Sequence, residues 1–449
     1  MARAVLPLQA LPLEIYGCIV DEIPGSDICS LRECSLAASV FRRLCQERLF
    51  SDLWINLGTP TYDMRETDLY LDGDRYKYRP RAINEMLDES PHLADYFATV
   101  CVSLPNLSSS WAEHEPDMRR LLQRLTSIHT MTIEGRYPAP KALTIVVIQW
   151  LLDIFQAHKE LEYLKYRRTD ITSSLLRQSL GAATELTFRE VGVFKDVDGN
   201  SLPSISTPTK PPLTELNIIK SPAICALLAQ PSFGPYLWEV CDLYQNDIER
   251  DDILPPCFAV AATLERLQCY FDDLETVPSF PASLPRLREL VFSMPRHSYD
   301  LPAVLVNLLA QGGVPSLVNL ELRLKLYAVF PDKLERQFQA QATLYKEFDD
   351  AIVMHPTLKA VEWFFSRDCD IAYEHNDKGK DDSDVENEDQ DEDQDAENED
   401  QDEDQDNDDE DDRHKNGTPW DAGMILERFK KWLPKAGAKG LLLVDGERQ

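Results

Sequence analysis

Apolar residues recur along most of the chain in a six-residue pattern, apolar-x-x-apolar-x-apolar. Copies of this pattern begin at residues 50, 97, 128, 161, 183, 213, 264, 287, 317 and 358, and a weaker copy spans 237–242. The second half of each copy alternates apolar and polar positions, which is typical of a short strand with one buried face. The pattern therefore predicts a series of short strands in order along the chain.

Helical patterns lie between many of these strands, at residues 143–158, 171–181, 221–230, 301–313 and 333–353. Most strand patterns from 161 to 317 start 22 to 30 residues apart, close to the period of leucine-rich repeats. The alternation predicts the α/β class and an irregular leucine-rich-repeat solenoid, a curved parallel sheet with outer helices. A doubly wound α/β sheet is the alternative, but the Gly-rich turn expected after an early strand is absent from the sequence.

The first fifty residues have a different pattern and predict three helices. The first opens at Pro12, where a missing N–H costs nothing, and stops at Pro24-Gly25, while Ser26 or Asp27 can cap the second. One stripe of the first helix carries apolar residues at every fourth position: Leu11, Ile15, Ile19 and Ile23. Helices this short bury little by themselves, so the stripe should face either a partner protein or the open end of the first repeat.

Charge is distributed unevenly along the 449 residues. The formal net charge is −32, from 78 acidic and 46 basic residues. Residues 376–412 hold 23 acidic residues and two lysines and contain the sequence ENEDQDEDQD twice, which leaves −11 for the rest of the chain. A segment this polar cannot offset the entropy of ordering, so we expect a disordered loop. Direct nucleic-acid binding is not expected, because phosphate contacts need clustered Lys and Arg.

An apolar helix pattern and a strand pattern follow the acidic run, which is therefore an insertion and not a tail. The helix has Ile425, Phe429 and Trp432 on one face, and residues 441–444 form the last predicted strand. The predicted organisation is a helical module at 1–55, the solenoid at 56–375, the disordered acidic insertion at 376–413, and a final helix and strand completing the solenoid at 414–449.

Ten cysteines are scattered without a CxxC pair, and most stand in apolar stretches. This usage favours buried thiols in a reducing compartment over a disulfide framework. Pro7, Pro12 and Glu14 interrupt any signal-peptide core, and the longest apolar run is too short to cross a bilayer. We expect a cytoplasmic or nuclear protein, or one found in both, without a membrane partner.

Motifs that carry catalysis are missing from the sequence. There is no P-loop, GxSxG, GxGxxG or HExxH, and the eight histidines have no Cys or His at metal-ligand spacing. The cysteines at 29, 34 and 45 alternate with Leu and Phe on predicted helices, which favours packing over a metal cluster. We therefore expect no enzymatic activity, no metal and no cofactor.

Residues 1–55 resemble an F-box, the short helical module that docks on a Skp-type adaptor of cullin–RING ubiquitin ligases. The resemblance rests on Leu11-Pro12 with Glu14 and Ile15, on Leu31 and the run CSLAASVF, and on the closing RLFSDLWI. The wider layout is similar to the F-box-like leucine-rich-repeat proteins of mushroom-forming (basidiomycete) fungi, as in MLDESPHLADYFATVCVSL and WLPKAGAKGLLLVD.

The resemblance implies a non-catalytic substrate receptor of a Skp–cullin–F-box ubiquitin ligase. The N-terminal helices would bind the adaptor, and through it a cullin, while the concave strand face would hold an unknown target protein. The residues expected at the adaptor are Leu11, Pro12, Ile15, Ile19, Leu31, Val40 and Phe41. Two other functions stay open: a leucine-rich-repeat scaffold with a degenerate F-box, and an acidic chaperone or chromatin-associated protein that binds basic proteins through the acidic run.

A further candidate surface is the stretch 62–81, which is rich in Tyr and Arg, residues favoured at binding hot spots. Tyr70, Tyr76 and Tyr78 are the candidates for a rim that contacts the target. The alternative is an ordinary solvated loop whose tyrosines lie on the end of the solenoid.

Overall fold

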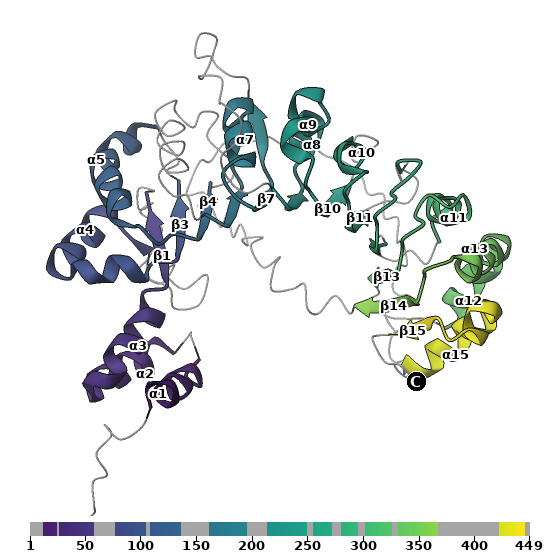
Figure 1. Cartoon of the computed structure of the whole chain (residues 1–449), viewed down its shortest axis with the longest axis horizontal. Coiled ribbons are helices and arrows are strands. Elements are labelled where there is room, and N and C mark those ends of the chain that lie inside the picture. The colour runs from purple at the N-terminus through teal and green to yellow at the C-terminus, as the bar shows by residue number, and fades with distance from the viewer. Residues whose placement is uncertain are drawn as a thin grey trace, which may run out of the picture.

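One long, curved parallel sheet dominates the structure, a computed structural model of the chain. The sheet lines the inner side of an arch, helices cover its outer side, and three further helices lie at its N-terminal end (Figure 1). The structure describes residues 12–24, 27–57, 77–104, 108–135, 161–194, 213–248, 255–271, 280–294, 301–325, 331–366 and 422–444.

Strands follow one another across the sheet in nearly the order of the chain. Within the described ranges these are β1 Asp52–Asn56, β2 Lys77–Tyr78, β3 Thr99–Ser103, β4 Thr130–Glu134, β5 Tyr163–Arg167, β7 Glu185–Arg189, β9 Glu215–Ile219, β10 Asp242–Ile248, β11 Arg266–Phe271, β12 Glu289–Ser293, β13 Asn319–Lys325, β14 Ala360–Ser366 and β15 Leu442–Val444. The order runs from β15 to β3 without reversal, then β1, with β2 at the edge. A doubly wound sheet reverses its strand order at a switch point, so that alternative is wrong and the architecture is a solenoid-like α/β fold.

The ten strong copies of the sequence pattern all coincide with strands of this sheet, which confirms those predictions. The weak copy at 237–242 is wrong by three residues, because β10 starts at Asp242 and pairs Leu243 with Leu216 and Gln245 with Ile218 of β9. Three short strands were not predicted: β2, and the pair β6 Asp170–Thr172 and β8 Gly192–Phe194, which forms a small parallel sheet of its own.

Helices follow many of the strands on the outer side. They are α4 Pro80–Glu89, η3 Pro91–Tyr96, α5 Ser108–Arg124, α7 Ser173–Leu180, α8 Pro222–Leu228, η4 Pro231–Phe233, α9 Gly234–Leu237, α10 Pro255–Val260, α11 Ala303–Ala310, α12 Pro331–Ala340, α13 Ala342–Met354, α15 Ala422–Trp432 and α16 Pro434–Ala438. The helix predicted at 333–353 is two helices divided at Gln341, whose Oε1 accepts a hydrogen bond of 2.8 Å from the backbone N–H of Leu301. The helix predicted at 143–158 lies outside the described residues.

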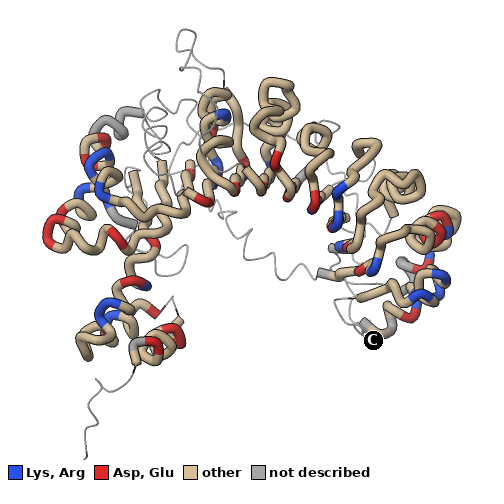
Figure 2. Tube along the Cα trace, in the orientation of Figure 1, with Lys and Arg blue, Asp and Glu red and all other residues tan. Residues whose placement is uncertain are grey.

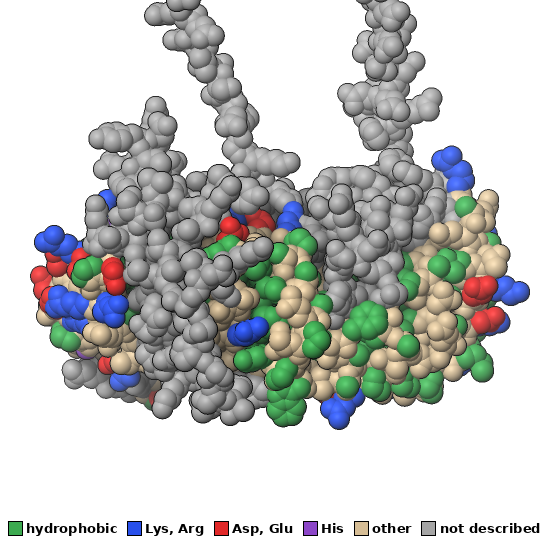
Figure 3. Space-filling model, turned by 90° about the horizontal axis from the view of Figure 1, so that it is seen from above, with side chains coloured by type: hydrophobic (Ala, Val, Ile, Leu, Met, Phe, Trp, Pro, Cys, Tyr) green, Lys and Arg blue, Asp and Glu red, His purple; other side chains and the backbone are tan. Residues whose placement is uncertain are grey.

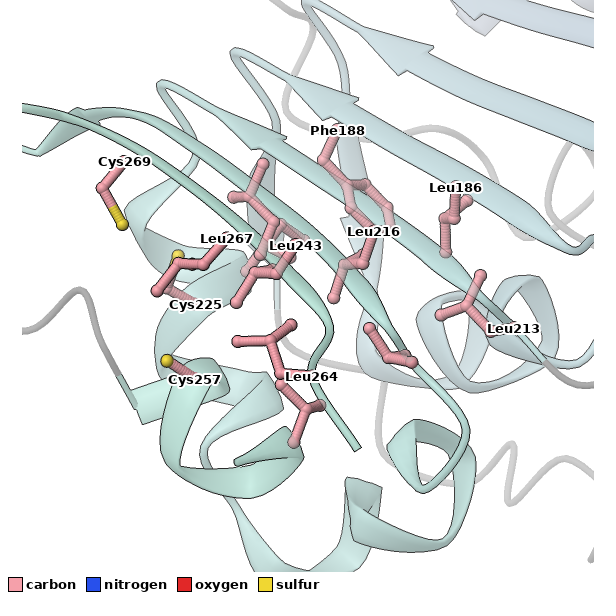
Figure 4. Close-up of a cluster of buried hydrophobic side chains, with 14 of the residues drawn as sticks. Leu186, Phe188, Leu213, Leu216, Cys225, Leu243, Cys257, Leu264, Leu267 and Cys269 are labelled. Atoms are coloured by element: carbon pink, nitrogen blue, oxygen red, sulfur yellow. The ribbon is translucent and has the colours of Figure 1, made fainter. Parts of the chain in front are cut away.

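The core lies between the sheet and the outer helices. The apolar positions of each pattern point toward the helices and stack from strand to strand, as Leu186, Leu216, Leu243 and Leu267 do in Figure 4. Every one of these four side chains is buried. The core is therefore continuous along the arch, as expected where each repeat packs on its neighbours.

The segment that follows the acidic run adds the last strand at the C-terminal end of the sheet. Strand β15 pairs with β14, and the ring of Phe429 stacks on that of Trp363 with centroids 4.3 Å apart. The buried carboxylate of Asp349 accepts hydrogen bonds from the backbone N–H groups of Lys435 and Ala436, 3.1 and 2.9 Å away. The helix face of Ile425, Phe429 and Trp432 is buried, which confirms its prediction. The insertion at 376–413 lies outside the described residues.

The N-terminal module consists of α1 Leu13–Asp21, α2 Ile28–Ala37 and α3 Ser39–Leu49. Asp27 caps α2 by accepting a hydrogen bond of 3.0 Å from the backbone N–H of Ser30. The predicted boundary at residue 55 is wrong by about five residues, because the carbonyl of Ser51 already accepts the N–H groups of Ala98 and Thr99 and β1 is part of the sheet.

Candidate binding surfaces

Helix α1 presents two different apolar faces. Tyr16 and Val20 point into the module and are only 2% and 1% exposed. Ile15 and Ile19 point outward, and each keeps 45% of its surface exposed. Two members of the predicted stripe, Ile15 and Ile19, therefore face away from the core of the module, whereas Ile23 packs against it. The sequence could not show which of the two faces of α1 would be buried.

The core of the module is a small cluster separate from the core of the sheet. It consists of Tyr16, Val20, Leu31, Phe41 and Cys45, with the rings of Tyr16 and Phe41 edge to face at 5.2 Å. Leu31 is 1% exposed and Phe41 is 9% exposed. The prediction that these two side chains contact an adaptor is therefore wrong for this structure, because both are enclosed by the chain's own helices.

The other residues of the predicted adaptor surface divide into three groups. Pro12 is exposed beside Ile15 and Ile19 at the start of α1. Val40 is half-buried and packs against the module core. Leu11 lies outside the described residues. The outward surface that the structure supports is therefore Pro12, Ile15 and Ile19, which we call the α1 stripe.

Contacts from α3 hold α1 in place. A guanidinium nitrogen of Arg48 donates a hydrogen bond to the backbone carbonyl of Val20, and the same nitrogen lies 4.0 Å from the carboxylate of Asp21. The module meets the sheet through Phe50, whose ring lies edge to face with that of Phe97 at 6.0 Å. Among the described residues, Ile15 and Ile19 belong neither to the core of the module nor to the core of the sheet, so covering the first repeat does not account for them.

A second candidate surface is the concave face of the sheet. Side chains alternate along a strand, so the polar positions of each pattern face the hollow of the arch while the apolar positions face the helices. On β5 the alternation places Tyr163, Lys165 and Arg167 on the concave side, with Leu164 and Tyr166 buried behind them. Acidic and basic residues alternate in groups along this inner ribbon (Figure 2).

A basic cluster occupies the carboxyl ends of β5 and β7. It consists of Lys165 and Arg167 on β5 and Arg189, the register partner of Arg167, on β7. Among the described residues, Glu134 is closely paired with this cluster, with a carboxylate oxygen 3.1 Å from Arg167 Nη1. The enclosed Nε atoms of both arginines have no hydrogen-bond partner among the described residues. Partial burial, together with the charges of Arg167 and Arg189, lowers the pKa of Lys165.

The turns after these strands pair an arginine with a glutamate. Arg168 and Glu190 directly follow β5 and β7 and adopt left-handed backbone conformations, with φ of 48° and 54°. Arg168 Nε donates to a carboxylate oxygen of Glu190 at 3.0 Å, whereas Arg189 Nε is 3.9 Å from the other oxygen. Glu190 is therefore committed mainly to Arg168 and only weakly to Arg189.

An acidic row crosses the amino ends of the neighbouring strands. Glu185, Glu215 and Asp242 are register partners on β7, β9 and β10. Burial and the negative charges of Glu215, Glu162 and Asp242 raise the pKa of Glu185. Burial also raises the pKa of Asp242, although Arg266, 3.8 Å away, opposes that shift. The row therefore carries more negative charge than its neighbours neutralise.

Neutral side chains separate the acidic row from the basic cluster. Thr187 lies between Glu185 and Arg189 on β7, and its hydroxyl accepts hydrogen bonds from Tyr163 Oη at 3.1 Å and Asn217 Nδ2 at 3.3 Å. Asn217 also donates to Glu215 at 2.9 Å. These hydrogen bonds fix a polar floor between two regions of opposite charge.

The other candidate groups are placed as follows. Tyr78 lies on β2 at the N-terminal edge of the sheet, while Tyr70 and Tyr76 lie outside the described residues. The cysteines at 45, 101, 225, 257 and 269 are buried, as predicted, whereas Cys18 and Cys29 are exposed. Within the part of the chain that the structure describes, no group of three or more His, Cys, Asp or Glu could hold a metal ion, and no helix is long and apolar enough to cross a membrane.

Among the described residues seen in Figure 3, apolar side chains are scattered over the outer, helical side. Its most exposed aromatic residues include Trp238, which directly follows α9, and Phe258 in α10, at 62% and 52%. No family model matches the chain, and no curated protein matches it. The candidate surfaces therefore rest on geometry and charge alone.

Proposed function

We propose that the chain is a non-catalytic substrate receptor of a Skp–cullin–F-box ubiquitin ligase, built from an F-box-like module and an irregular leucine-rich-repeat solenoid. The observation that carries the proposal is the outward direction of Ile15 and Ile19 on a helical module with a core of its own. Among the described residues, this second apolar face of α1 is not part of the module core, and a helix with such a face is suited to bind another protein through it.

The α1 stripe has the composition of an interface anchor. Two isoleucines and a proline at the start of a helix offer rigid apolar surface with little side-chain entropy to lose. Burying an isoleucine completely is worth about 1.5–3 kcal/mol, so the exposed halves of Ile15 and Ile19 together offer about that amount. Flanking contacts from the rest of the module would supply the remainder.

The arch suits the second half of the task. A receptor has to hold a target close to enzymes that other subunits carry, and binding both proteins to one body raises their effective concentration for each other. The concave face offers in-register rows of polar and charged side chains for this purpose, as the basic cluster and the acidic row illustrate. The expected location is cytoplasmic, nuclear or both, where Skp-type adaptors and cullins act.

Capture of a purified Skp-type adaptor by the full chain tests this proposal. The double variant Ile15→Asp/Ile19→Asp places two charges where an apolar partner would bind, so adaptor affinity should fall at least a hundredfold, about 2.7 kcal/mol. Both side chains lie outside the module core, so the melting temperature should change little. Leu36→Asp is the matched control, because Leu36 is 80% exposed on α2 but is not part of the α1 stripe.

An adaptor that binds wild type and both variants equally would show that the α1 stripe is not the docking surface. Failure of the wild-type chain to bind any Skp-type adaptor would instead favour the scaffold with a degenerate F-box. Salt-sensitive binding of histones by residues 376–412 without adaptor binding would favour the acidic chaperone or chromatin-associated protein.

A further inference from the structure

Two regions of opposite charge lie on the concave face of the same strand. Strand β7 carries Glu185 at its amino end, Thr187 in the middle and Arg189 at its carboxyl end. Four residues of strand span about 13 Å, so Arg189 and Glu185 are too far apart to neutralise each other. Each belongs to a larger group of the same sign, the basic cluster on β5 and β7 and the acidic row on β7, β9 and β10.

The spacing of these charges matches that of an extended peptide. Side chains at positions i, i+2 and i+4 of an extended chain lie on one face, about 6.6 Å apart from each to the next. A peptide lying along β7 could therefore place an acidic side chain over Arg189, a small polar one over Thr187 and a basic one over Glu185. The hydroxyl of Thr187, held by Tyr163 and Asn217, leaves a flat polar floor beneath the middle position.

The same arrangement disfavours other classes of ligand. A nucleic acid or a continuous polyanion that entered over Arg167 and Arg189 would bring further negative charges to the acidic row, whose members already repel one another and hold a raised pKa at Glu185. A polycation on the acidic row would meet the basic cluster in the same way. The surface therefore selects a ligand that changes sign along its length.

We propose that the concave face over β5, β7, β9 and β10 binds an extended peptide of the target protein that carries an acidic and a basic side chain four residues apart. The acidic side chain pairs with Arg167 and Arg189, and the basic one pairs with Glu185, Glu215 and Asp242. This inference rests on the proposed function only in assigning the peptide to a target, because the binding itself involves no adaptor.

Fluorescence anisotropy of the full chain with a labelled peptide, Gly-Glu-Val-Thr-Val-Lys-Gly, measures this binding directly. The β-branched residues favour the extended form. The control peptide, Gly-Val-Glu-Lys-Val-Thr-Gly, has the same composition but places the two charges on neighbouring residues, which face opposite sides. General attraction to the acidic run at 376–412 is equal for both peptides, so the first should bind about tenfold more tightly only if the spacing of charges is read.

Double-mutant cycles then assign each end of the peptide. Replacing the peptide Glu by Gln, or making the protein variant Arg189→Gln, should each weaken binding about five- to tenfold, and the two together should cost no more than one alone. The peptide Lys→Gln change and Glu185→Gln should be coupled in the same way. For the crossed pairs, such as the peptide Lys→Gln change with Arg189→Gln, the two fold-losses in affinity should multiply, because the two changes act at different ends of the site.

Equal affinity of the protein for the two peptides would overturn the proposal. It would also be overturned if the losses in affinity multiplied for the peptide Glu→Gln change with Arg189→Gln and for the peptide Lys→Gln change with Glu185→Gln. Arg189→Gln and Glu185→Gln each replace a charged side chain on the sheet surface by a neutral one of similar size, and an unchanged circular dichroism spectrum with a cooperative thermal melt confirms that each variant is folded. Adaptor binding by the same preparations is measured separately. Loss of adaptor binding with the peptide result intact would refute the receptor function and leave the peptide site standing.

Discussion

Truncating Leu290 tests whether the sheet and its helices share one continuous core. Leu290 of β12 is fully buried and lies in register between Leu267 of β11 and Leu320 of β13, with Leu305 of α11 in the same core. Changing it to Ala removes three carbon atoms, a transfer cost of about 2.4 kcal/mol at 0.8 kcal/mol for each CH₂ group. Neighbouring strands on both sides resist collapse, and a residual cavity adds about 24 cal/mol for each Å³ that stays open. We expect a loss of about 3–4 kcal/mol in the free energy of unfolding.

Position within the sheet should change this cost in a defined way. Leu442 of β15 is 6% exposed and has a strand neighbour on one side only among the described strands, so Leu442→Ala should cost less, about 2 kcal/mol. Gln268→Ala, at a half-buried concave position of β11, is the control and should cost under about 0.5 kcal/mol. Urea unfolding followed by circular dichroism and tryptophan fluorescence measures all three. A loss below 0.5 kcal/mol for Leu290→Ala would refute the continuous core.

Three further predictions concern single groups. Gly135→Ala should destabilise the fold strongly, because the new Cβ would lie 2.1 Å from the backbone carbonyl oxygen of Arg168. A Cβ at Gly17 in α1 meets no atom within 4 Å, so Gly17→Ala should raise the free energy of unfolding by about 0.5–1 kcal/mol. Thermal melts of the two variants that reverse this order would contradict the packing. Burial raises the pKa of Cys45 to about 11 and the pKa values of Cys225 and Cys257 to about 12. After brief treatment with iodoacetamide at pH 8, mass spectrometry should therefore find these three thiols unmodified and the exposed Cys18 and Cys29 modified. The raised pKa of Glu185 means that its carboxylate binds a proton more tightly in the folded chain than in the unfolded chain. Glu185→Gln should therefore stabilise the fold at pH 7 and lose this advantage as the pH falls to about 4. An equal effect on the melting temperature at both pH values would rule out repulsion among the carboxylates of the acidic row.

The strands were predictable because one physical rule sets them all. Each repeat buries three apolar positions against helices, so the same spacing recurs wherever a strand lies. Strand β10 shows where the rule fails. Its third inward position is Gln245, which is fully buried and donates a hydrogen bond of 3.6 Å to the sulfur of Cys225. At this position a hydrogen bond to Cys225 of α8 replaces the apolar contact, and the pattern of apolar residues along β10 cannot predict such a contact with another element.

The division of α12 from α13 and the direction of α1 also depended on contacts between elements. The stretch around Gln341 has no Gly or Pro, yet the helix is interrupted where Gln341 accepts the N–H of Leu301. In α1 both the Ile15–Ile19 face and the Tyr16–Val20 face are apolar, and only the packing of Phe41 and Cys45 decides which is buried. Periodicity finds a helix, but it cannot choose between two apolar faces.

The charged concave face was present in the sequence but required the register to be known. Lys165 is a polar position of LEYLKY, and Arg167 and Arg189 directly follow LEYLKY and ATELTF. Taken alone, each of these residues is typical of an ordinary solvated charge. Aligning the copies by their buried leucines places Arg167 beside Arg189 and Glu185 beside Glu215, as the sheet does. Grouping like charges across strands costs stability, since direct neighbours of the same sign repel. The sheet keeps two such groups of opposite sign about 13 Å apart on β7, which is the arrangement that a ligand of alternating charge would relieve.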